Sequence, residues 1–232
     1  MPHSAAPASA VQQRTSTQEA LFSGLLALLP RAAVLTDTED LRPFECDGLS
    51  VYRRLPLVVV LPETIAQVQA IMRLCHQLQI PVVARGAGTG LSGGALPLDD
   101  GVLLSLARFK RILHIDPHNA QATLQPGVRN LAISEAAAVH GLYYAPDPSS
   151  QIACTIGGNV AENSGGVHCL KYGLTVHNIL MLKVVTMDGE FVHHLQPCGN
   201  DACRDNRTHC GTGFFYIVER GQHYLRAFRL GQ

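Results

Sequence analysis

Residues 84–94 read Ala-Arg-Gly-Ala-Gly-Thr-Gly-Leu-Ser-Gly-Gly and hold five glycines in eleven positions. Glycine accepts positive φ angles and lets a ligand approach the backbone closely. Successive N–H groups in such a loop form a nest for an anion, to which Arg85, Thr89 and Ser92 add a cation and hydroxyl donors. The segment therefore predicts a diphosphate-binding loop. A flexible linker is the alternative, but the loop stands between two expected core strands.

The spacing Gly88-x-Gly90-x-x-Gly93 also matches the dinucleotide fingerprint of Rossmann folds, which bind NAD. That site requires the third glycine to open a helix whose N-terminus receives the pyrophosphate. Here the chain continues Ala-Leu-Pro-Leu-Asp-Asp-Gly over residues 95–101. Pro97 and the Asp-Asp-Gly turn do not allow a regular helix, so we discard the Rossmann interpretation.

The segments around this loop alternate between strand and helix patterns, which predicts an α+β fold. The apolar run 57–61 is typical of a buried strand, and residues 63–79 have the periodicity of an amphipathic helix. A right-handed crossover would then make the next strand, 82–84, parallel to the first. Other expected elements are strands at 102–106, 120–124 and 179–186, a helix at 129–140 before Gly141, and a short helix from a capping box at Ser16 to Leu29 that follows a frayed terminus over 1–15.

A second group of glycines stands about 65 residues further on. Residues 146–150 read Pro-Asp-Pro-Ser-Ser, residues 155–166 read Thr-Ile-Gly-Gly-Asn-Val-Ala-Glu-Asn-Ser-Gly-Gly, and residues 171–173 read Lys-Tyr-Gly. The amides of Asn159 and Asn163 can both donate and accept hydrogen bonds. That chemistry suits a ring with alternating acceptors and donors, such as a flavin or an adenine. Each asparagine alone could be a turn residue, but the two glycine groups together indicate a ligand site.

The composition excludes several classes of protein. The chain has 232 residues, of which 47% are hydrophobic and 16% charged, with 18 basic and 18 acidic side chains. A disordered chain and a basic nucleic-acid-binding surface are therefore not expected. No apolar run reaches the ~18–20 residues of a membrane span. Seven scattered cysteines do not form a complete disulfide framework, which favours a reducing cytoplasm.

At the two glycine segments the sequence resembles the PCMH-type FAD-binding proteins, also called the vanillyl-alcohol-oxidase type. The match covers residues 40–190, and the stretch 145–173 is most similar to the flavin-binding subunits of bacterial glycolate oxidases and to D-lactate dehydrogenases. The resemblance implies two α+β subdomains that clasp an extended FAD, the smaller at about 55–110 and the larger from about 111. It divides the chain into an N-terminal helical segment (1–54), an incomplete FAD-binding domain (55–190) and a divergent tail (191–232).

The resemblance also implies a set of cofactor-binding residues. The first loop would hold the pyrophosphate and the second group would line the rest of the flavin site. The FAD would be non-covalent, because no histidine stands inside the first loop; Cys154 and His168, near the second group, are interpreted as packing residues. The cofactor-binding set is Arg85, Gly86, Ala87, Gly88, Thr89, Gly90, Ser92, Gly93, Pro146, Asp147, Ser150, Gly157, Gly158, Asn159, Asn163 and Gly165.

The reaction implied by the resemblance is oxidation of a 2-hydroxy acid, glycolate or D-lactate, to the 2-oxo acid. The flavin would accept a hydride from the substrate while a base takes the hydroxyl proton. Electrons would pass to a partner, often an iron–sulfur subunit, which could place the protein at the inner face of the membrane. The sequence names no general base: His114, His118, His140 and His177 are each expected to be surface or core residues.

After Glu190 the resemblance stops. Family members continue with a further flavin-contacting stretch and a cap domain that binds substrate, so we expect the cap to be missing. The change in composition favours a frameshift or a premature end near residue 190. Cys198, Cys203 and Cys210 do not have the spacing of a standard zinc site, and we expect no metal. The chain could instead be an inactive remnant, or a flavin-binding module that a partner completes.

Overall fold

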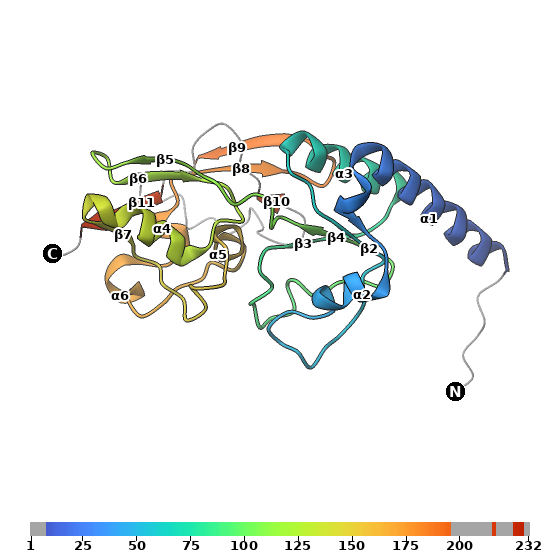
Figure 1. Ribbon diagram of the computed structural model, residues 1–232, viewed down its shortest axis with the longest axis horizontal. Coiled ribbons are helices and arrows are strands. Elements are labelled where there is room, and N and C mark those ends of the chain that lie inside the picture. The colour runs from blue at the N-terminus through green and yellow to red at the C-terminus, as the bar shows by residue number, and fades with distance from the viewer. Residues whose placement is uncertain (1–7, 196–214, 217–224, 230–232) are drawn as a thin grey trace.

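The computed structural model describes residues 8–195, 215–216 and 225–229. The chain forms two lobes side by side, each with its own sheet and helices (Figure 1). The tail cysteines Cys198, Cys203 and Cys210, considered above for zinc, lie outside the described residues. No helix in the described ranges is both long and apolar enough to cross a membrane.

The first lobe is built on a four-stranded sheet in the order β1-β2-β4-β3. Its strands are β1 (Val34–Leu35), β2 (Val58–Val60), β3 (Val82–Arg85) and β4 (Val102–Ser105). β2 and β3 both pair in parallel with β4, so the two strands of the expected β-α-β unit are parallel but have β4 between them. All residues of β2 and β4 are buried, which explains their uninterrupted apolar sequences.

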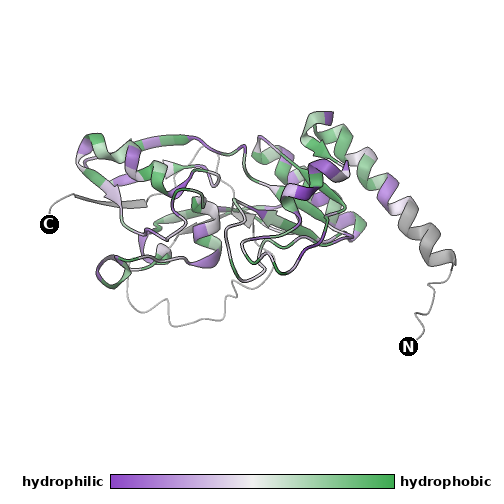
Figure 2. Ribbon diagram, turned by 60° about the horizontal axis from the view of Figure 1, so that its bottom comes forward, coloured by the Kyte–Doolittle hydropathy of each residue, from purple (hydrophilic) through white to green (hydrophobic). Residues whose placement is uncertain are grey.

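Helices cover both faces of this sheet. α1 (Ala8–Leu28) packs with α3 (Ile65–Leu78) over one face, and the short α2 (Thr38–Leu41) covers the other. Figure 2 shows hydrophobic and hydrophilic residues alternating along the helices of this lobe, as expected for helices with one buried face. The prediction for α1 is corrected at its start, since the helix begins at Ala8 and not at Ser16. Residues 8–15 include alanine, glutamine and arginine, which favour helix and extend it N-terminally.

The second lobe contains two antiparallel sheets. One has the order β5-β6-β11-β7, and the other has the order β10-β8-β9. α4 (Asn130–Ala137) packs on β7, continues as a 3-10 turn to His140 and ends at Gly141 with φ +69°, as predicted for its C′ position. The strands are β5 (Ile112–Asp116), β6 (Gln121–Leu124), β7 (Leu142–Tyr144), β8 (Met181–Val185), β9 (Phe191–Leu195), β10 (Phe215–Tyr216) and β11 (Leu225–Arg229).

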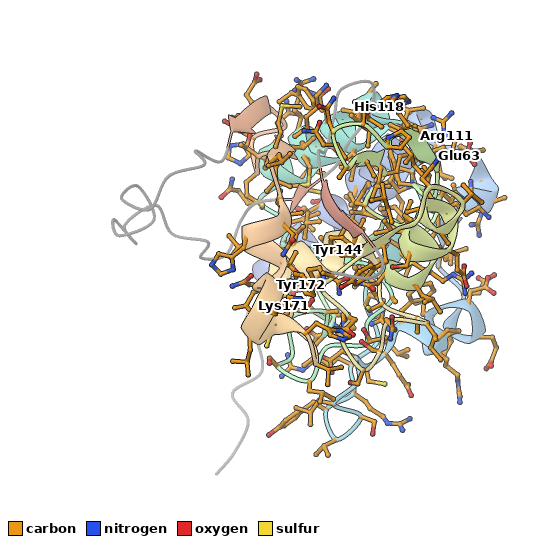
Figure 3. All side chains as sticks on the ribbon, turned by 90° about the vertical axis from the view of Figure 1, so that its left-hand side faces the viewer. Glu63, Arg111, His118, Tyr144, Lys171 and Tyr172 are labelled. Carbon is orange, nitrogen blue, oxygen red and sulfur yellow. The ribbon has the colours of Figure 1, made fainter. Side chains whose placement is uncertain are left out.

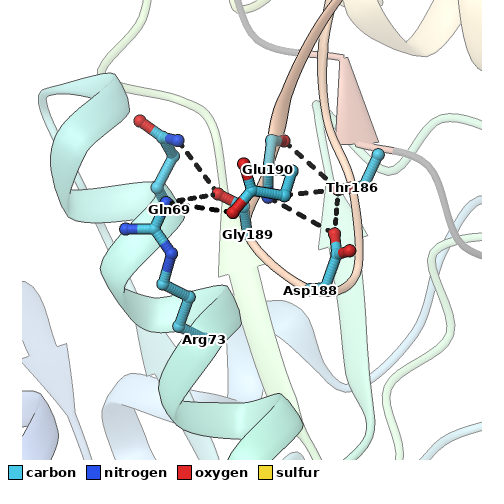
Figure 4. Close-up of polar contacts among 6 residues, drawn as sticks. All are labelled: Gln69, Arg73, Thr186, Asp188, Gly189 and Glu190. Atoms are coloured by element: carbon cyan, nitrogen blue, oxygen red, sulfur yellow. Dashed lines mark hydrogen bonds and ion pairs between the residues drawn. The ribbon is translucent and has the colours of Figure 1, made fainter.

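The turn between β8 and β9 reaches back to the first lobe. The carbonyl oxygen of Gly189 accepts hydrogen bonds from Gln69 Nε2 at 2.9 Å and Arg73 Nη2 at 3.0 Å (Figure 4). Val185 is fully buried in the core of the first lobe, and Phe191 packs against that core. The hairpin therefore fixes the two lobes relative to each other, which sets the width of the space between them.

Candidate functional site

The two glycine-rich segments meet at a cavity of about 380 Å³ between the lobes. One wall is the loop that follows β3, and the other is the segment that leads into α5 (Ile156–Glu162). Ten of the predicted cofactor residues line this cavity: Arg85, Gly86, Ala87, Gly88, Thr89, Gly90, Ser150, Gly157, Gly158 and Asn159. The structure thus brings together residues that lie about 65 positions apart in the sequence.

Arg85 holds the first loop in shape from inside. Its side chain is buried, and Nη1 donates to the carbonyl oxygens of Cys46 at 2.7 Å and Ala95 at 3.2 Å. Burial lowers the pKa of this guanidinium, while Cys46 and Asp47 oppose that shift. A Cβ built on Gly88, which has φ +70°, would lie 2.3 Å from Arg85 Nη2. The guanidinium is therefore folded under the loop backbone, and a side chain at residue 88 would collide with it.

Gly86 and Thr155 make the closest approach between the two segments. A Cβ on Gly86 would lie only 2.3 Å from Thr155 Oγ1, so no larger residue fits there without movement. Thr155 lines the cavity and is 7% exposed, and its Oγ1 is buried without a hydrogen-bond partner in the described part of the chain. Buried polar atoms are nearly always paired, so this hydroxyl is an unpaired polar group enclosed where Gly86 and Thr155 meet.

Asn159 has an internal role that the sequence did not indicate. Its Oδ1 accepts from Asn130 Nδ2 at 2.9 Å, and its own Nδ2 donates to Cys154 Sγ at 3.2 Å. Asn130 Nδ2 also donates to the carbonyl oxygen of Pro146 at 2.9 Å. These hydrogen bonds connect α4, α5 and the chain at Pro146 and Cys154. The amide of Asn159 therefore shapes the cavity wall that it lines, and its expected contacts with a ring stay a prediction.

Six predicted residues lie outside the cavity lining. Asn163 ends α5 with φ +48°, and its Oδ1 accepts from the backbone N–H of Val176 at 3.0 Å. Asp147 Oδ2 pairs with His168 Nδ1 at 2.7 Å, which gives His168 a polar partner beyond the packing role expected for it. The six residues are Ser92, Gly93, Pro146, Asp147, Asn163 and Gly165.

Two tyrosine rings and a lysine side chain form a cluster at the end of the second glycine segment. The ring centroids of Tyr143 and Tyr172 are 6.1 Å apart, and Lys171 Nζ lies 5.0 Å from the centroid of the Tyr172 ring (Figure 3). A hydrogen bond with Tyr143 lowers the pKa of Tyr172, and burial raises the pKa of Tyr143 to about 12. His118 lies well apart from this group. No histidine of the described residues lines the cavity, and Glu162 is the one carboxylate among the described residues that line it.

The cavity wall also contains residues that the sequence analysis did not select. Thr155 and Glu162 stand within the second glycine segment, and Pro148, Ser149 and Ser164 stand beside predicted positions. Their positions beside the selected glycines are the sequence signal that could have identified them as site residues.

Comparison with known proteins agrees with this geometry. A protein-family profile described as "FAD binding domain" matches residues 56–194. Glycolate oxidase subunit GlcD of Escherichia coli K12 is 66% identical over 171 residues, which are 72% of this chain and 34% of that protein. D-lactate dehydrogenase of Anaerostipes hadrus is 38% identical over 160 residues, which are 68% of this chain and 34% of that protein.

The fold is likewise found in a solved structure. The crystal structure of p-cresol methylhydroxylase superposes with a TM-score of 0.70 at 22% identity, covering 80% of this chain and 37% of that one. The expected PCMH-type fold and its FAD-binding character are confirmed. The chain spans about a third of the length of the curated relatives that it matches.

Proposed function

The chain belongs to the FAD binding domain family, and from that premise we propose that it binds FAD non-covalently in the cavity between its two glycine segments. The meeting of the two glycine segments carries this proposal, because ten of the expected cofactor residues, drawn from both segments, line one cavity. The glycines of the opposite wall leave the backbone open to a diphosphate. A volume of about 380 Å³ lies within the usual range for ligand sites.

The cavity residues divide by the part they would play. The backbone of residues 86–90 would bind the diphosphate, with Thr89 as a hydroxyl donor, and Arg85 would keep that backbone in place. Ser150, Gly157 and Gly158 would form the opposite wall, which Asn159 supports from behind. Ser92, Gly93, Pro146, Asp147, Asn163 and Gly165 remain cofactor residues only in a proposed indirect sense, by shaping the segments.

We further propose that the reaction served is oxidation of a 2-hydroxy acid, with glycolate and D-lactate as the candidate substrates. The two relatives named above support this substrate class by their names. FAD supplies a two-electron acceptor when bound. The protein's part is to orient the flavin and to exclude water from the cavity. The substrate side of the site is not assigned to residues of this cavity, which has no histidine among the described residues that line it.

We propose that the described residues form the flavin-holding part of such an oxidase. The Escherichia coli relative is itself named as a subunit, which supports work within an assembly. We propose partner subunits, among them an iron–sulfur protein as electron acceptor, and a cytoplasmic position near the membrane through those partners. The three-part division at residues 54 and 190 stays a proposal as well.

The test uses the full chain and anaerobic spectroscopy. FAD is titrated while the quenching of its fluorescence is followed, and glycolate, D-lactate or succinate is then added to the loaded protein. We expect saturable FAD binding, and bleaching of the flavin band only by a 2-hydroxy acid once partner polypeptide is supplied. FAD binding without bleaching by either hydroxy acid would refute the substrate class and leave the cofactor site. A folded chain that does not bind FAD would refute both.

A further inference from the structure

Glu162 places a carboxylate in the wall of the cavity, opposite the first glycine loop. It is the last residue of α5 and its side chain is exposed. A Cβ built on Gly94 would lie 2.7 Å from Glu162 Oε1, and one built on Gly90 would lie 3.8 Å from it. Within the described ranges no hydrogen bond or ion pair engages this side chain. The carboxylate is thus directed at the far end of the loop and is available to a ligand.

A carboxylate at this place restricts what it can contact. An ionised carboxylate only accepts hydrogen bonds, and beside a phosphate it is repelled. The donors of FAD are the N3–H of the flavin, the amino group of the adenine and the hydroxyls of the ribityl chain and the ribose. Of these, the hydroxyls lie nearest the diphosphate, on both sides of it. A hydrogen bond from a hydroxyl to an ionised acceptor is stronger than one between neutral groups.

We propose that Glu162 is a specificity-determining residue that accepts hydrogen bonds from the cofactor hydroxyls next to the diphosphate. The inference rests on the proposed function, since it needs FAD in this cavity. The loop backbone at residues 86–90 takes the diphosphate, and Glu162 stands beyond it, against Gly90 and Gly94. The residue therefore determines the position of the bound cofactor along the loop. It also disfavours ligands that place an additional phosphate group next to its carboxylate.

The experiment compares Glu162→Ala and Glu162→Gln with the unchanged full chain. Glu135→Ala is the matched control, because Glu135 is an exposed carboxylate on α4 away from the cavity lining. Dissociation constants are measured for FAD, FMN and ADP, and the melting temperature is measured without ligand. We expect Glu162→Ala to weaken FAD binding about tenfold, Glu162→Gln to weaken it about threefold, and the control to be unchanged.

The two fragments identify which hydroxyls are recognised. A matching loss for FMN assigns the ribityl chain, and a matching loss for ADP assigns the ribose. An equal or tighter affinity of Glu162→Ala for FAD overturns the inference and shows that the carboxylate only repels phosphate. A loss that follows a lowered melting temperature of the ligand-free protein also overturns it. If the unchanged chain binds none of the three ligands, the proposed function fails first.

Discussion

Gly88→Ala tests how the first glycine loop is held. Alanine at φ +70° costs about 1 kcal/mol, because an L side chain is strained in the left-handed region. The new Cβ would also lie 2.3 Å from Arg85 Nη2 and 2.5 Å from Cζ. The guanidinium could move only by giving up at least one of its bonds to Cys46 and Ala95, and one hydrogen bond of a charged group is worth about 2 kcal/mol. We expect a total loss of about 3 kcal/mol in unfolding free energy.

Gly141→Ala and Gly93→Ala are matched controls for this prediction. Both glycines have positive φ, +69° and +79°, and a Cβ on either meets nothing within 4 Å. Each should therefore lose only about 1 kcal/mol, and the effect of alanine on the unfolded chain is common to all three variants. Urea unfolding followed by circular dichroism gives the comparison. The role assigned to Arg85 is refuted if Gly88→Ala and Gly141→Ala agree within about 0.5 kcal/mol, the usual error of such differences.

Three further perturbations follow from the described contacts. Thr155→Val should leave the ligand-free protein as stable as before or more so in urea unfolding, since it removes an unpaired buried hydroxyl; a loss above about 1 kcal/mol would contradict the absence of a partner for that hydroxyl. Asn130→Ala should cost about 2–4 kcal/mol in urea unfolding, because Pro146 O and Asn159 Oδ1 lose their donor, and a cost below about 1 kcal/mol would exclude the network. Burial raises the pKa of the Cys75 thiol from 9.0 to about 12, so the folded state keeps a proton that the unfolded chain releases. The contribution of this thiol to the unfolding free energy should then be constant below pH 9 and fall between pH 9 and about 12, by up to about 1.4 kcal/mol per pH unit. Cys75→Val should make this decline less steep. An unaltered slope would show that other groups cause the decline.

The sequence predicted the central elements of the fold because their signals are local. The buried strand at 58–60, the amphipathic helix at 65–78 and the C′ glycine at 141 each depend on a few neighbouring residues. The helix α5 was not predicted, since the two glycines in its first turn lower its intrinsic propensity. It forms because Ile156 is buried against the core of the second lobe, a contact that no local pattern contains.

The candidate site was predicted as a pair of segments but not in its working details. Glycine content alone located both walls of the cavity. The partners of Arg85 come from residues 44–46 and 95, and the partner of Asn159 is on α4, so their roles depend on the tertiary structure. The internal hydrogen bonds of these two side chains could therefore not be predicted from the sequence, and their contacts with a cofactor stay a prediction. Thr155 was overlooked because its importance lies in being buried without a partner, which only the structure reveals.

The most direct test of the account is the visible absorption spectrum of the full chain after it is mixed with FAD and passed through gel filtration. The account predicts a flavin band that elutes with the folded chain at about one FAD per protein. It also predicts that Gly86→Ala, whose Cβ would lie 2.3 Å from Thr155 Oγ1, elutes folded but with little or no flavin. A folded, colourless chain, or a Gly86→Ala variant that keeps its full flavin content, would contradict a cofactor site between the two glycine segments.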